Sequence, residues 1–104
     1  MRIEDNLAPQ VTVIVPALNE ADTIREVIER VLAIPLRVQL IVVNDGSTDR
    51  TIEILKDVAA MDSNVKVIDF ARNFGHQTAV TAGIDYSATR DWGINLQIPY
   101  IDRY

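Results

Sequence analysis

Three times along the chain, a short apolar run ends in polar, turn-forming residues and is followed by a segment with helical features. The runs occupy residues 11–15, 38–43 and 65–70, and each is rich in β-branched side chains. Continuous apolar runs of this length are typical of strands that are covered on both faces, as in a parallel sheet. The pattern therefore predicts three buried strands, each leading into a helix.

The segments after these runs have helical spacing. The first places apolar side chains three and four residues apart, at Ile24, Val27, Ile28, Val31 and Leu32. The second has an inner face of Ile52, Leu55, Val58 and Ala59, and the third, from 76 to about 87, is rich in small residues. Strands that alternate with helices through right-handed crossovers predict an α/β fold with a parallel sheet. The expected strand order is 3-2-1, with any fourth strand beside the first.

Polar residues at the starts of the first two helices suggest caps. Asn19 is followed three residues later by Asp22, which is close to the spacing of a capping box. Ser47, which follows an Asn-Asp-Gly turn, is of a type that commonly caps a helix. We therefore predict that Asn19 and Ser47 are N-caps.

The same pattern divides the chain into three parts. Residues 1–9 mix charged and apolar residues without a continuous apolar run and predict a flexible lead-in. Residues 10–89 predict one βαβαβα domain, and residues 90–104 form a divergent tail. Residues 90–100 have no run of four apolar residues, so we expect this part of the tail to be irregular or a weak edge element.

Charge and composition exclude several classes of partner and of binding site. The 104-residue chain is 48% hydrophobic and carries a net charge of -5, which argues against nucleic acid or an anionic membrane as the main partner. It has no cysteine, so disulfides and thiolate metal sites are excluded. No apolar run approaches the roughly 18 residues of a transmembrane segment, and we expect a cytoplasmic protein.

Candidate chemistry lies in the polar stretches 16–20, 44–49 and 72–77, which follow the three predicted strands. The carboxyl ends of parallel strands share one sheet edge, where ligands commonly bind. Asp45 is suited to accept a hydrogen bond from a nucleobase, and Arg72 to offset the charge of a diphosphate. The alternative is that these residues only form caps and turns, and His76 alone is no argument for catalysis.

Other nucleotide sites of α/β folds do not fit. The loop at 16–20 has no glycine, which excludes both the dinucleotide fingerprint and the phosphate-binding P-loop. A phosphoacceptor receiver would need an acidic pair after the first strand and an aspartate at the end of the third. Asp69 is followed by Phe70 rather than ending that run, so this alternative is discounted.

Three motifs, Pro-Ala-Leu-Asn-Glu at 16–20, Val-Asn-Asp-Gly-Ser-Thr-Asp at 43–49 and Arg-Asn-Phe-Gly-His-Gln at 72–77, resemble family 2 glycosyltransferases in order and spacing. The resemblance covers roughly residues 10–89. It is strongest to the bacterial branch that transfers a sugar from a nucleotide donor to polyprenyl phosphate. It implies a Rossmann-like, three-layer, amino-terminal half of a glycosyltransferase-A fold, and a transferase of the inverting hexosyl type that often works at the cytoplasmic face of a membrane.

The resemblance also implies a binding site for a UDP- or GDP-sugar. Residues of the first motif would line the nucleoside pocket, Asp45 would bind the base, and the third motif would lie near the diphosphate. The substrate-binding residues expected on this basis are Pro16, Ala17, Asn19, Glu20, Asp45, Gly46, Ser47, Arg72, Asn73, Gly75 and His76. An Asp45→Ala change is expected to weaken nucleoside binding with little loss of fold, because a loop carboxylate contributes little to a core.

The chain departs from the family pattern after residue 89. Relatives bind Mg²⁺ or Mn²⁺ through an Asp-x-Asp motif at the end of a fourth strand, and no Asp-x-Asp occurs here. If residues 96–99 align with the family, Gly93 and Asn95 take the two aspartate positions. The catalytic base is also missing. We therefore expect a truncated half that binds a nucleotide sugar but is inactive alone.

Two alternatives stay open. One is a non-catalytic module that binds a nucleotide or another protein, with the outer edge of the first strand free to pair in a dimer. The other is a remnant of marginal stability, which a non-cooperative thermal transition would favour.

Overall fold

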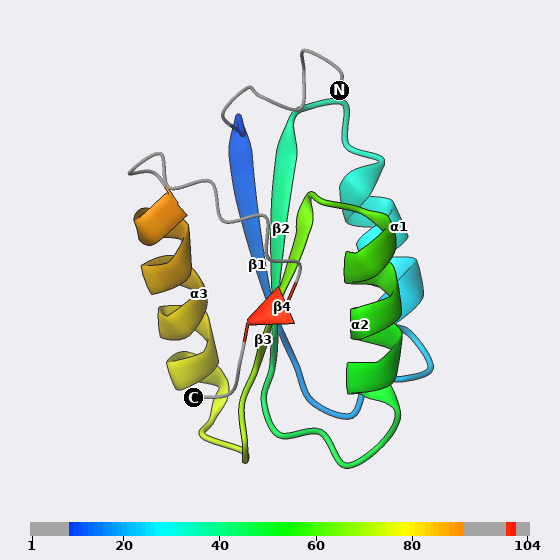
Figure 1. The fold of residues 1–104 in the computed structure, drawn as a ribbon, viewed down its shortest axis with the longest axis vertical. Coiled ribbons are helices and arrows are strands. Elements are labelled where there is room, and N and C mark those ends of the chain that lie inside the picture. The colour runs from blue at the N-terminus through cyan, green and yellow to red at the C-terminus, as the bar shows by residue number, and fades with distance from the viewer. Residues whose placement is uncertain (1–8, 91–99, 102–104) are drawn as a thin grey trace.

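The computed structural model describes residues 9–90 and 100–101. They form three layers, with a parallel sheet between two layers of helices (Figure 1). The strands are β1 (Val11–Ala17), β2 (Val38–Asn44), β3 (Val65–Asp69) and β4 (Tyr100–Ile101). The helices are α1 (Ile24–Leu32), α2 (Thr51–Met61) and α3 (His76–Arg90). Helices α1 and α2 lie on one face of the sheet and α3 on the other. The predicted α/β class is confirmed.

Alternation of side chains along β2 builds the two halves of the core. Leu40 and Val42 pack with residues of α1 and α2, whereas Ile41 and Val43 pack under α3. All seven residues of β2 are buried, as a strand covered on both faces requires. The predicted helical face of α1 is confirmed at Ile24 and Ile28, which are buried, but is wrong at Val27, which is exposed.

The sheet order agrees with the prediction for the first three strands, since β2 pairs in parallel with β1 on one side and β3 on the other. The place of the fourth strand differs. We expected it beside β1, but Tyr100 and Ile101 of β4 pair with Val67 and Ile68 of β3. Strands that follow one another in sequence commonly lie side by side, and within the described ranges β4 is the next strand after β3. The two-residue β4 agrees with the weak edge element expected of the tail.

The outer side of β1 is open within the described ranges, where β2 is its sole partner strand. The carbonyl of Ala17 accepts a hydrogen bond from the N–H of Asp45 at 2.9 Å, so the backbone polar groups of Ala17 point toward β2. Those of the preceding residue, Pro16, therefore point to the outer edge of the sheet. Proline suits this outer position because it has no N–H to donate to a neighbouring strand. Pairing of this edge with another chain stays a prediction.

The two predicted caps are wrong. Helix α1 begins at Ile24, well after Asn19, and no side chain caps it. Helix α2 begins at Thr51 rather than directly after Ser47. Both polar side chains are instead bonded to distant loops, as described below, which a local capping rule cannot anticipate.

Some predictions fall outside the described residues. The expected lead-in, residues 1–9, is described at residue 9 alone, and Gly93 and Asn95 lie in a part of the tail that is not described. Within the described ranges, no helix is both long enough and apolar enough to cross a membrane.

Close packing of α3 on β1 gives a first prediction. A Cβ atom at Gly83 would lie 2.5 Å from Cγ2 of Ile14, a methyl group on a stiff, β-branched side chain. We expect Gly83→Ala to destabilise the protein by about 1 kcal/mol in urea unfolding, because overpacking outweighs the gain in helix propensity. In an Ile14→Ala background the cost should disappear. An equal cost in both backgrounds would mean that this contact is not its cause.

Candidate functional site

The predicted polar stretches 16–20, 44–49 and 72–77, called here the first, second and third loops, start side by side at one edge of the sheet. Ala17, Asn44 and Asp69 end their strands in register with one another. The backbone ladder continues one step further, because the Phe70 N–H donates to the Asn44 carbonyl at 2.9 Å. Below the loops, the Asn44 side-chain amide donates to the Asp69 carboxylate at 2.9 Å, and both side chains are buried. The loops therefore begin from a rigid, hydrogen-bonded base.

Asp45 joins the second loop to the third. Its carboxylate accepts hydrogen bonds from the backbone N–H of Phe74 at 2.8 Å and of Gly75 at 3.1 Å. The residue is only 4% exposed, although it lies just beyond the end of β2. A carboxylate offers about four acceptor positions, and these two bonds occupy two of them. Asp45 is thus both a wall of the site and the anchor of the loop opposite.

Gly46 lets the second and third loops touch. Its backbone has φ of +76°, a conformation that residues with a side chain rarely adopt. A Cβ atom there would lie 2.3 Å from the Asn73 nitrogen and 2.4 Å from the Arg72 carbonyl carbon. Only glycine permits this approach, so the turn that the sequence predicts at Gly46 also serves the packing of a loop far along the chain.

A first cavity of about 240 Å³ opens among the three loops. It is lined by Pro16, Ala17, Leu18, Asp45, Asn73, Gly75 and His76. All but Leu18 were predicted as site residues, and they come from all three motifs. Ligand pockets generally measure about 300–1,000 Å³, so the first cavity is large enough for part of a nucleotide sugar but not for all of it.

A second cavity of about 350 Å³ is lined by residues of the second and third loops and their neighbours, and by none of residues 16–20. The predicted residues Gly46, Ser47, Arg72 and Asn73 line it, together with the buried pair Asn44 and Asp69 and with other neighbours. Asn73 lines both cavities, which therefore adjoin at the third loop. The predicted residues Asn19 and Glu20 line neither of these two cavities.

Arg72 is held against an aromatic side chain. Its guanidinium lies 4.7 Å from the centre of the Phe74 ring, and Phe74 in turn packs edge-to-face on Phe70, with 5.3 Å between ring centres. Cation–π contacts of this kind favour a defined side-chain position while the charge stays accessible to solvent or ligand. Arg72 is exposed and lines the second cavity, so its charge is available there.

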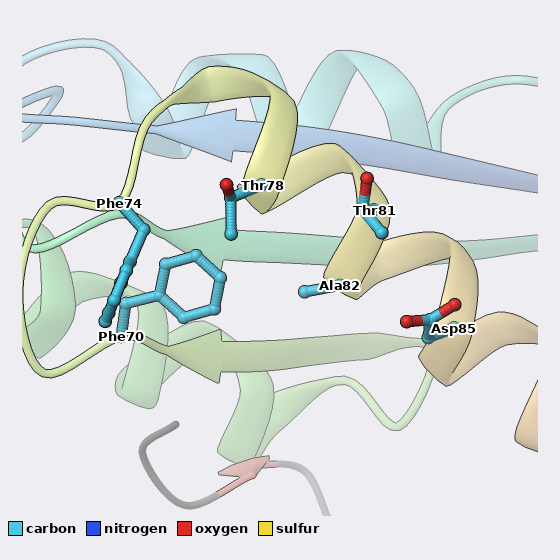
Figure 2. A pocket seen from close by; sticks show the side chains of 6 residues that line it. All are labelled: Phe70, Phe74, Thr78, Thr81, Ala82 and Asp85. Atoms are coloured by element: carbon cyan, nitrogen blue, oxygen red, sulfur yellow. The ribbon is translucent and has the colours of Figure 1, made fainter.

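The sequence did not predict a third cavity, of about 300 Å³, between the end of β3 and one flank of α3 (Figure 2). Its lining is mainly apolar and consists of Phe70, Phe74, Thr78, Thr81, Ala82 and Asp85. The signal that was available is a pair of phenylalanines next to a helix of small residues, which leaves space beside the rings. Phe74 links this cavity to the arginine stack.

Asp49 lies in the predicted stretch 44–49 but was not among the substrate-binding residues expected there. Its carboxylate accepts hydrogen bonds from the N–H of Ala21 at 3.2 Å and from both the N–H and the hydroxyl of Thr51. The Thr51 hydroxyl is the main reason that the pKa of Asp49 lies below its ordinary value, and the two backbone N–H groups add to the effect.

The lowered pKa of Asp49 predicts an acid-sensitive loop contact. Because the folded-state pKa lies below the unfolded one, the contact stabilises fully above about pH 4 and is lost as pH falls through the folded-state value. We expect the NMR shifts of the Ala21 and Thr51 amides to move together in that range. An Asp49→Asn variant should lack this titration, and an unchanged titration in the variant would contradict the assignment.

The described residues do not fit a divalent metal ion. No group of three or more His, Cys, Asp or Glu side chains in residues 9–90 or 100–101 is arranged to bind one. Asp45 and Asp49 both direct their oxygens at N–H groups of neighbouring loops.

Comparison with known proteins agrees with the arrangement of the three motifs. Residues 12–96 match the model of glycosyl transferase family 2. The chain belongs to this family. The resemblance predicted from the motifs is thereby confirmed, and the α/β fold with its parallel sheet is consistent with a glycosyltransferase-A half.

Several curated proteins are similar to this family 2 chain. The uncharacterized glycosyltransferase YkcC of Bacillus subtilis is 46% identical over 82 residues, which cover 75% of this chain and 25% of YkcC. The dodecaprenyl-phosphate galacturonate synthase of Rhizobium johnstonii is 36% identical over 78% of this chain, again across 25% of its own length. An undecaprenyl-phosphate 4-deoxy-4-formamido-L-arabinose transferase of Edwardsiella ictaluri is 33% identical over 73% of this chain, or 25% of the enzyme. The chain thus spans about a quarter of the curated relatives it matches.

Proposed function

We propose that this family 2 chain binds the nucleoside of a UDP- or GDP-sugar in the first cavity, as the donor half of a sugar transferase. The main support is that residues from all three motifs line this one hollow, with the Asp45 carboxylate in its wall. Caps and turns alone would not require three loops to enclose a shared space. The cavity lies at the carboxyl ends of parallel strands, where α/β proteins commonly bind nucleotides.

The chemistry of the lining suits a nucleobase. Pro16, Ala17 and Leu18 offer an apolar wall for a flat ring, and Leu18 is 41% exposed, so part of that wall faces solvent. Asp45 keeps two acceptor positions for base N–H groups after bonding Phe74 and Gly75. Uracil and guanine both carry ring N–H donors, which is consistent with either nucleotide.

The diphosphate would lie toward Asn73 and the second cavity. A chain with a net charge of -5 must supply local groups to hold an anion. Arg72 brings a guanidinium to the second cavity, and α3 begins at His76, next to the first cavity, where free N–H groups favour negative charge. We propose that these groups bind the diphosphate, with Mg²⁺ or Mn²⁺ expected only by family.

The acceptor is proposed by class. Two similar proteins are named for dodecaprenyl and undecaprenyl phosphate, so we propose a polyprenyl phosphate acceptor for the whole protein of which these residues form the donor half. Sugar transfer breaks the bond from the anomeric carbon to the diphosphate and forms one to an acceptor oxygen. The sequence contains neither an Asp-x-Asp motif nor an assigned base, so we propose that the chain alone does not catalyse this step. A cytoplasmic location is part of this proposal.

The test is calorimetric titration of the purified chain with UDP and with GDP, with and without Mn²⁺. We expect binding that favours one base and does not depend on the metal. A cooperatively folded chain that binds neither nucleotide would overturn the proposal and favour a protein-interaction module, with the outer edge of β1 as its surface. Turnover of a nucleotide sugar by the chain alone would overturn the expected inactivity.

A further inference from the structure

The first and second loops are joined by hydrogen bonds in which each loop supplies both donors and acceptors. From the first loop, the backbone N–H groups of Asn19 and Glu20 donate to the hydroxyls of Ser47 and Thr51, both at 2.9 Å. The Ala21 N–H donates to the Asp49 carboxylate at 3.2 Å. Three successive backbone donors of one loop are therefore satisfied by side chains of the other.

The return contact comes from one side chain. Oδ1 of Asn19 accepts the N–H of Thr48 at 2.8 Å and that of Asp49 at 3.3 Å, and it also lies 3.3 Å from the Thr48 hydroxyl. We call this set of bonds between residues 19–21 and 47–51 the loop clasp. Since each loop supplies both donors and acceptors, neither loop can shift without breaking several bonds at once.

The backbone of Asn19 explains why asparagine occupies this position. Its φ of +54° lies in the left-handed region, where asparagine is several-fold enriched and most other side chains are strained. Glycine would also accept this backbone but has no oxygen to offer Thr48 and Asp49. Aspartate would keep both the oxygen and some tolerance of the backbone. Glycine and aspartate at position 19 therefore distinguish the need for a left-handed backbone from the need for a side-chain acceptor.

The loop clasp is next to the first cavity along the chain. Leu18, which lines the cavity, precedes Asn19, and Asp45, which forms another wall, lies just before the clasped segment of the second loop. Asn19 and Asp49 themselves line neither the first nor the second cavity. Their bonds reach the cavity only through the backbone that they hold.

We propose that Asn19 and Asp49 are positioning residues, which fix the wall at residues 16–18 relative to Asp45 and do not touch the ligand. This reassigns Asn19 from the expected binding set. The effect on affinity rests on the proposed nucleotide function, whereas the effect on loop order does not. The two can therefore be tested separately in the same purified chain.

The first arm measures loop order without ligand. Amide hydrogen exchange at Thr48 should rise by about tenfold in Asn19→Gly, because its side-chain acceptor is gone, and the amide shifts of Ala17 and Gly75 should change. Asn19→Asp should keep exchange near that of the unmodified chain. Asn64→Gly, the same chemical change at an exposed turn before β3, is the matched control. Unchanged exchange and unchanged shifts in Asn19→Gly would overturn the proposal.

The second arm measures the Kd for UDP and GDP. Asn19→Gly should weaken binding about tenfold, while Asn19→Asp and Asn64→Gly should bind as the unmodified chain does. If Asn19→Asp keeps Thr48 protected yet binds as weakly as Asn19→Gly, the amide group of Asn19 contacts the ligand and the proposal is wrong. If the unmodified chain binds neither nucleotide, the proposed function fails, and the exchange and shift data alone decide the loop clasp.

Discussion

Replacing Gly46 with alanine is expected to destabilise the fold by about 3 kcal/mol and to weaken nucleotide binding at least tenfold. The new methyl group would meet backbone atoms of Arg72 and Asn73 at 2.3–2.9 Å, and backbone cannot turn aside as a flexible side chain can. The positive φ of Gly46 adds strain of its own. Urea unfolding and a UDP or GDP titration measure the two effects.

Gly75→Ala is the matched control for the stability of Gly46→Ala. Gly75 also has a positive φ, of +102°, but a Cβ atom there would have no neighbour within 4 Å. Its cost should reflect backbone strain alone, about 1–2 kcal/mol, and the larger cost at Gly46 should report the contact between loops. Equal costs for the two variants would mean that the third loop moves away from Gly46 without penalty.

Asp45→Ala is the second change with a large expected effect. It removes the acceptor of two backbone N–H groups, so we expect a loss of about 2 kcal/mol in unfolding free energy together with more than tenfold weaker nucleotide binding. The sequence alone predicts little loss of fold, because Asp45 lies in a loop. Its 4% exposure and its two bonds change that expectation.

Two further variants, Asp45→Asn and Asp57→Ala, separate the loss of hydrogen-bond acceptors from the loss of a negative charge as causes of the effects of Asp45→Ala. Asn keeps one acceptor oxygen and should lose less stability than Ala, whereas Asp57→Ala removes the same charge from an exposed position on α2 and should change neither quantity. Wild-type stability in Asp45→Ala would show that solvent replaces the carboxylate at no cost. In that case, any remaining loss of affinity would report contact with the ligand alone.

Sequence patterns predicted the strands and helices well because those features are local. The apolar runs at 38–43 and 65–70 lie in β2 and β3 apart from Phe70, and the small residues of α3 pack as closely as Gly83 requires. The motifs also identified most of the residues around the first cavity. Family membership followed from the same motifs.

The sequence predictions were wrong or incomplete where contacts between residues far apart in the chain determine the structure. Asn19 looks like a cap when read with its neighbours, but its side chain is taken by Thr48 and Asp49, which are 29 and 30 positions away. The turn at Gly46 is visible in sequence, whereas its contact with Asn73 is not. β4 has only two residues, too few for any hydrophobic pattern to place it on the outer edge of β3.

The side-chain bonds between the loops have a consequence for how the site forms. Those of Asp45, of the loop clasp and of the Asn44–Asp69 pair join residues 25 to 31 positions apart in the sequence. No one loop can assemble any of them before the sheet brings the strand ends together, so an early, half-folded chain has no partial site. A nucleotide that fills the first cavity would therefore bind only the fully folded domain. The melting temperature of the whole domain would rise with the nucleotide concentration.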